Sequence, residues 1–177
     1  MRRLLDRLYH ASGAFAALCI AAIFVLMLAQ SFGREAGILI RGAEDIVAWL
    51  CAASAFFALG HTFRHGELVR VGLWLDMLGT RGRRIAELFS LASTALFVVY
   101  MLWAIARFVY DSWQFKEVAQ GLIPIPIWVP QLSFLLGVLI LFIAVIDELM
   151  AVIKKQKPAY QLAEEARRAA GDFSETV

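Results

Sequence analysis

Four long apolar stretches constrain this chain more than any other feature, because each is long enough to cross a bilayer as a helix. They cover residues 11–32, 46–63, 85–110 and 128–153, and none has an acidic or basic residue near its middle. A hydrocarbon core about 30 Å thick needs about 20 apolar residues at 1.5 Å per residue. The residues are 61% hydrophobic, against about 45–50% in soluble domains. We therefore predict an all-α integral membrane protein with four transmembrane helices.

The distribution of basic residues predicts the orientation of these spans. Of the 17 Lys and Arg, thirteen lie before the first span, between spans two and three, or after span four, and only three lie in the two opposite loops. Basic residues accumulate on the cytoplasmic side of a membrane. Both termini are therefore predicted to be cytoplasmic, with a four-helix membrane domain over residues 1–153 and a cytoplasmic tail over residues 154–177.

The connection between spans two and three, residues 61–87, contains a mostly apolar run at 68–78. That run is too short to cross a bilayer, and it is flanked by arginines. A basic connection of this kind is typical of a helix that lies along the membrane surface. We predict a short elbow helix at about 67–79, lying on the cytoplasmic surface or against a partner.

Several features near the span ends leave alternatives open. Residues 1–10 form either a short surface helix or the cytoplasmic foot of the first span. Gly13, Ala17 and Ala21 form either a stripe for close helix approach or plain filler. Asp147 and Glu148 are either interfacial acids or partners of a basic group on another subunit.

Two charged residues near span ends, Asp45 and Arg107, are explained without a functional role. Asp45 begins span two, where the helix N-terminus favours negative charge. Arg107 lies four residues before Asp111 and is interpreted as a side chain that extends to the membrane surface rather than as a substrate contact.

The spans lack the residues that catalysis or ion coupling would require. An ion-coupled carrier that works alone normally keeps a charged residue inside the membrane, and here only Glu87 is a plausible candidate. The three histidines, His10, His61 and His65, are fewer than the four that two bis-histidine haems need. We predict no enzyme activity and no cofactor or metal, and we interpret the chain as an accessory subunit. A stand-alone carrier acting as a homodimer remains an alternative, as does a membrane enzyme or haem electron carrier.

Two motifs carry a resemblance to a known family. RHGELVRVGLWLDML follows span two, and LIPIPIWVP precedes span four. In this order, within a four-span layout with both ends inside, they resemble the small membrane subunit of tripartite ATP-independent periplasmic (TRAP) transporters. One departure is Leu68-Val69, where the family often has a histidine followed by Ile or Val. Arg70 and Val71 keep the pattern.

The resemblance implies partners and a mode of action. A large membrane subunit, paired one-to-one with this chain, would hold the substrate and sodium sites and move like an elevator. A periplasmic binding protein would deliver an organic acid, commonly a carboxylate, and the sodium gradient would drive its uptake. The small subunit would enlarge the static scaffold in the bacterial inner membrane and help to dock the binding protein. No nucleic-acid partner is implied.

The resemblance also suggests roles for individual residues. Trp74, Leu75 and Leu78 on the elbow are expected to pack against the partner or lie in the membrane interface, and Pro124, Pro126 and Trp128 to shape the outer loop near the docking side. Five arginines are expected to meet lipid phosphates at the inner surface: Arg64, Arg70, Arg81, Arg83 and Arg84.

Overall fold

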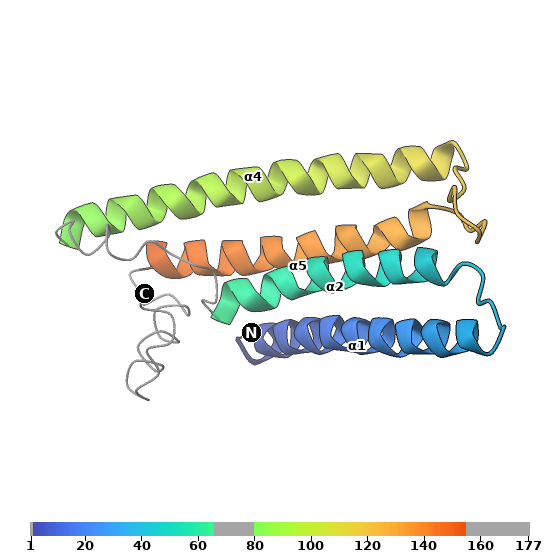
Figure 1. Cartoon of the computed structure of the whole chain (residues 1–177). Helices are drawn as coiled ribbons and strands as arrows, with labels where there is room; N and C mark the ends of the chain where they lie inside the picture. The colour runs from blue at the N-terminus through green and yellow to red at the C-terminus, as the bar shows by residue number, and fades with distance from the viewer. Residues whose placement is uncertain (1, 66–79, 155–177) are drawn as a thin grey trace, which may run out of the picture.

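A computed structural model describes residues 2–65 and 80–154, and in these parts the chain forms four helices (Figure 1). They are α1 (Arg2–Glu35), α2 (Ala43–His65), α4 (Thr80–Gln114) and α5 (Trp128–Ile153). All four are long and apolar enough to cross a membrane. Each predicted span corresponds to one of these helices, and α5 covers the residues predicted for the fourth span. The predicted elbow at 67–79 and residues 155–177 of the tail lie outside the described residues.

The other three helices are longer than the predicted spans. α1 has 34 residues and α4 has 35, so each is about 50 Å long at 1.5 Å per residue, well beyond the roughly 30 Å hydrocarbon core. Residues 2–10 continue into the first span without a break. Of the two interpretations left open for this segment, the foot of the first span is therefore the correct one.

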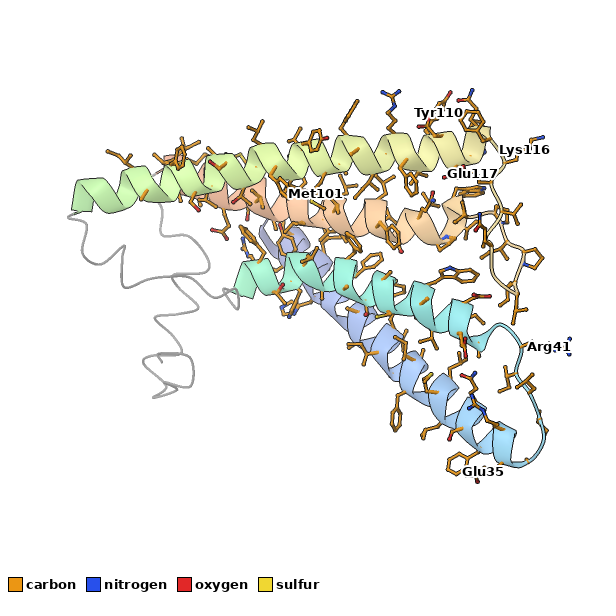
Figure 2. The ribbon with its side chains drawn as sticks, turned by 45° about the horizontal axis from the view of Figure 1, so that its top comes forward. Glu35, Arg41, Met101, Tyr110, Lys116 and Glu117 are labelled. Atoms are coloured by element: carbon orange, nitrogen blue, oxygen red, sulfur yellow. The ribbon has the colours of Figure 1, made fainter. Side chains whose placement is uncertain are left out.

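The helices follow one another in the spatial order α1, α2, α5, α4. α2 packs between α1 and α5, α5 packs between α2 and α4, and α1 touches α5 only slightly. Figure 1 shows this row from α4 at the top to α1 at the bottom. α1 diverges from α2 toward its Glu35 end (Figure 2). The two flanking helices therefore each have one main neighbour and expose much of their apolar surface.

Glycines allow the neighbouring helices to come close. A Cβ atom on Gly137 of α5 would lie 2.6 Å from the backbone carbonyl carbon of Phe56 on α2, and one on Gly13 of α1 would lie 2.8 Å from Nδ1 of His61. Helix association in lipid depends on such contacts, because lipid tails are as apolar as the side chains. Of the predicted small-residue stripe, only Gly13 is at a contact with another described helix, and Ala17 and Ala21 are exposed.

The buried core lies mainly between α4 and α5. Leu91, Ala95 and Val98 of α4 are buried against Val138 and Val145 of α5. The cluster continues toward the helix ends that contain Tyr9, Phe63 and Val152.

Candidate functional site

The described charged side chains gather at the two ends of the helix row. We name these ends by the orientation predicted from the basic residues: the inner end contains the start of α1 and the end of α2, and the outer end contains the loops after α1 and α4. The inner end has a group of charged side chains centred on Arg64. The outer end has a folded loop and a pocket.

At the inner end, Arg64 binds three carboxylates from two other helices. Its Nη1 donates hydrogen bonds to Asp147 Oδ2 at 2.6 Å and to Glu148 Oε1 at 3.1 Å, and its Nη2 donates to Asp6 Oδ1 at 3.2 Å. The ring of Tyr9 lies under the guanidinium, with 5.5 Å from Cζ to the ring centroid. We call these five residues the inner cluster. They join α1, α2 and α5.

Burial makes the inner cluster energetically important. The side chain of Glu148 is 1% exposed and that of Arg64 15%, so water screens their attraction little. The planar guanidinium can donate to several carboxylates at once, and its cation over the Tyr9 ring adds a further attraction. Arg64 also occupies the last turn of α2, where the helix dipole favours a positive charge. The cluster is therefore suited to holding three helices together.

The inner cluster changes how several residues are interpreted. Asp147 and Glu148 were expected to be interfacial acids or to pair with a group on another subunit. Neither alternative included a partner in the same chain, and both carboxylates bind Arg64. Arg64 was expected to meet lipid phosphate, and its described partners are these protein carboxylates. Its lipid contact therefore stays an untested prediction. Nothing in the sequence linked Arg64 to Asp6 and Asp147, because they lie 58 and 83 residues away.

Two hydrogen bonds next to the inner cluster attach α1 to α2. Ser12 Oγ donates to the backbone carbonyl of Phe57, and His61 Nδ1 lies 3.2 Å from the carbonyl oxygen of Tyr9. His61 is therefore placed in a helix contact. Among residues 2–65 and 80–154, no group of three or more His, Cys, Asp and Glu side chains is arranged to hold a metal ion.

At the outer end, Asp45 fastens the loop between α4 and α5 to the start of α2. Its Oδ2 accepts hydrogen bonds from the backbone N–H groups of Leu122 (2.7 Å) and Ile123 (3.3 Å). Gly121 lies so close to the Asp45 carboxylate that any side chain there would collide with it. Asp45 lies in the first turn of α2, as expected, but its contacts with this loop were not predictable from its position in the sequence.

The loop itself, residues 115–127 (the outer loop), folds back on itself. Ala119 N donates to Ile125 O at 2.9 Å, and Ile127 N donates to Glu117 O at 3.0 Å. Ser112 Oγ donates to the Glu117 carboxylate at 2.8 Å and accepts a hydrogen bond from Gln131 Nε2 at 3.2 Å. These bonds join the end of α4 to the start of α5.

α4 ends in a left-handed turn at Lys116. Lys116 N donates to Trp113 O at 3.3 Å, Glu117 N donates to Ser112 O at 3.0 Å, and the φ angle of Lys116 is 51°. This is the Schellman arrangement, in which glycine is the usual residue at the left-handed position. α1 ends in the same way, with Gly37 at φ 75°.

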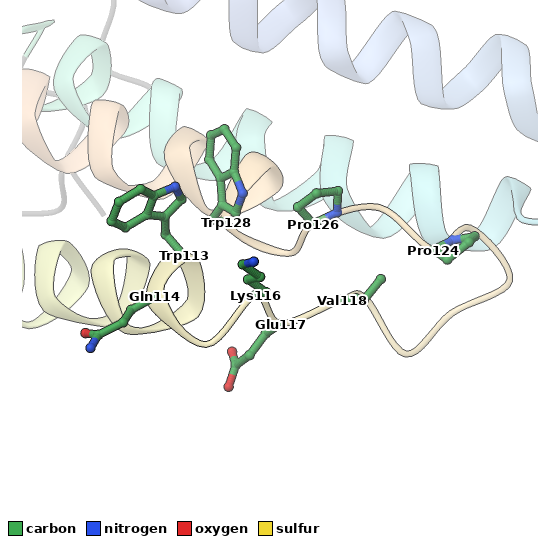
Figure 3. A pocket seen from close by; sticks show the side chains of 8 residues that line it. All are labelled: Trp113, Gln114, Lys116, Glu117, Val118, Pro124, Pro126 and Trp128. Carbon is green, nitrogen blue, oxygen red and sulfur yellow. The ribbon is translucent and has the colours of Figure 1, made fainter.

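A pocket of about 580 Å³ opens between the end of α4 and the outer loop, and we call it the outer pocket (Figure 3). Pro124, Pro126 and Trp128, which the sequence assigned to one outer region, all line it. Trp113 and Lys116 also line it and had not been grouped with them. The complete lining is Trp113, Gln114, Lys116, Glu117, Val118, Pro124, Pro126 and Trp128.

The remaining predicted site residues are described in part or not at all. Arg81, Arg83 and Arg84 lie in the first turns of α4, but their side chains are not described. Arg70, Trp74, Leu75 and Leu78 lie outside the described residues. Their predicted contacts with lipid or with a partner therefore stay predictions.

Comparison with known proteins gives one match. The sequence profile of the family described as "Tripartite ATP-independent periplasmic transporters, DctQ component" matches residues 23–155. This range runs from the second half of α1 to just past the end of α5. No curated protein and no solved structure gives a significant match to the chain.

Proposed function

Because the chain belongs to the DctQ family, the small membrane subunit of TRAP transporters, we propose that it is the static scaffold for a large permease subunit. That partner, paired one-to-one, holds the substrate and sodium sites and moves as an elevator. A periplasmic binding protein delivers an organic acid, commonly a carboxylate, and the sodium gradient drives uptake. The family match over residues 23–155 is the observation that carries this proposal.

The distribution of charge supports this division of labour. The middles of the four apolar helices contain no Asp, Glu, Lys or Arg, and intramembrane charged groups usually mark ion pathways. The described ion pairs lie instead near the helix ends: the inner cluster at one end and Arg107 with Asp111 toward the other. Charges in these positions are suited to fixing helices rather than to moving ions.

The arrangement of the helices in a row supports the proposal that the chain is a scaffold beside a larger protein. Large apolar side chains are exposed along α4, and Phe89 and Leu96 are more than 70% exposed. α1 likewise exposes Leu18 and Phe24. In the membrane such surfaces face lipid or another subunit. A row with two open flanks therefore offers a partner a large area while the two ends stay fastened by the inner cluster and Asp45.

Reconstitution into liposomes tests the proposal. The chain is purified alone, and also co-expressed with the large TRAP subunit. The binding protein loaded with a labelled carboxylate is supplied outside. We expect sodium-dependent uptake only when all three components are present. Uptake by this chain alone would contradict the proposal and favour a homodimeric carrier, with Glu87 as its coupling residue.

A further inference from the structure

Lys116 has a backbone conformation that its side chain makes unfavourable. It is the one non-glycine residue with positive φ in the described parts of the chain, whereas the equivalent turn after α1 uses Gly37. The left-handed conformation costs a non-glycine residue about 1 kcal/mol or more. When a non-glycine residue occupies such a conformation, its side chain is a candidate for a functional role.

Lys116 lines the outer pocket together with Trp128 and Pro126. The Glu117 carboxylate points away from those two residues (Figure 3). That carboxylate accepts a hydrogen bond from Ser112. Lys116 has no ion pair among the described side chains. The outer pocket therefore combines an unpaired cation with two indole rings, those of Trp113 and Trp128.

The position of the outer pocket along α4 corresponds to the lipid headgroups. The Arg107 side chain lies against the Trp103 ring and reaches Asp111, with 3.9 Å between Nε and Oδ2. A charged pair of this kind, next to an aromatic ring, marks the edge of the hydrocarbon core. α4 continues for three residues beyond Asp111, about 4.5 Å, before the turn at Lys116. The headgroup layer on each side of a bilayer is about 5–7 Å thick.

We propose that the outer pocket binds a phospholipid of the adjoining leaflet, with the Lys116 ammonium on the phosphate and the indoles of Trp113 and Trp128 at the level of the glycerol esters. A volume of about 580 Å³ exceeds that of a phosphate alone and admits the glycerol and the first acyl carbons. This lipid holds the end of α4 and the outer loop at a fixed depth in the membrane. The inference is independent of which permease the chain supports.

Native mass spectrometry of the full chain in mild detergent tests the proposal, with added dioleoyl phosphatidylglycerol as the probe. The charge is removed by Lys116→Gly and separately by Lys116→Asn, since both residues accept a left-handed backbone. Lys116→Arg is the matched control that keeps the charge. We expect the affinity for the first lipid to fall about fivefold in the Gly and Asn variants, the effect of one basic residue at a lipid surface. The Arg variant should stay within twofold of wild type.

Two results would overturn the proposal. One is equal lipid affinity in the wild type and both uncharged variants. The other is equal binding of dioleoylglycerol, which has no phosphate, because Lys116 would then contribute nothing to recognition. If the first result is accompanied by loss of binding to the periplasmic binding protein, the occupant of the pocket is a protein side chain.

Discussion

Replacing Arg64 by alanine should destabilise the helix row more than any other single change at the inner end. The change leaves Glu148, 1% exposed, and Asp147, 23% exposed, without the guanidinium that binds both. Removing one partner of a buried ion pair costs roughly 3–5 kcal/mol, because the buried charge that remains loses this attraction. We expect Arg64→Ala to lower the free energy of unfolding by about this amount.

Substitutions of the other residues in the inner cluster should lower the free energy of unfolding by smaller amounts. Asp6 is 48% exposed, and exposed ion pairs contribute about 0–1 kcal/mol, so Asp6→Asn should cost less than about 1 kcal/mol. Adding Glu148→Gln to an Arg64→Met variant should recover part of the lost stability, because it removes the buried charge that the first change leaves behind.

Unfolding of the full chain by sodium dodecyl sulfate in mixed micelles, followed by circular dichroism, measures these differences. Arg64→Lys serves as the control that keeps the charge but loses the planar donor group. An Arg64→Ala variant within about 1 kcal/mol of wild type would refute the reasoning. So would an Asp6→Asn variant as unstable as Arg64→Ala.

Three further predictions address other contacts. Gly137→Ala should lower the free energy of unfolding by about 1–3 kcal/mol in the same titration, because its Cβ would lie 2.6 Å from the Phe56 backbone. Gly37→Ala is the control: no atom lies within 4 Å of its Cβ, so it should cost only about 1 kcal/mol of backbone strain. Equal losses in the two variants would contradict this account of the α2–α5 contact. Asp45→Ala should speed amide hydrogen exchange at Leu122 and Ile123, whereas Asp45→Asn should retain most of the protection; unchanged exchange in Asp45→Ala would remove the proposed link. Leu75→Glu should reduce recovery of the permease complex in a pull-down if the elbow is embedded, and undiminished recovery would count against that placement.

The four spans were predictable because a membrane helix requires a long uncharged segment, and that requirement is visible in the sequence. The spatial order of the helices was not. In a soluble helix the apolar face indicates the neighbour, but a membrane helix is apolar on its lipid side as well. The contact between α2 and α5 therefore depends on Gly60, which lies against Ile140, and on Gly137, which lies against Phe56. The sequence alone does not reveal these pairs.

The two end sites were predictable to different degrees. Pro124, Pro126 and Trp128 lie close together in sequence, so their grouping at the outer loop could be predicted. Lys116 could not be assigned to this group from the sequence, because a left-handed backbone conformation is not visible in the sequence when the residue is not glycine. The inner cluster was missed because charges at span ends are ordinary, and because Arg64 and Asp147 are 83 residues apart, with the whole of α4 between them.

A pull-down of the tagged chain from its native membranes in mild detergent, followed by mass spectrometry, tests the central claim most directly. The scaffold assignment predicts recovery of a large many-span permease in an amount equal to the chain. Recovery of the chain alone, or only with copies of itself, would contradict that assignment and would make the homodimeric carrier the leading explanation.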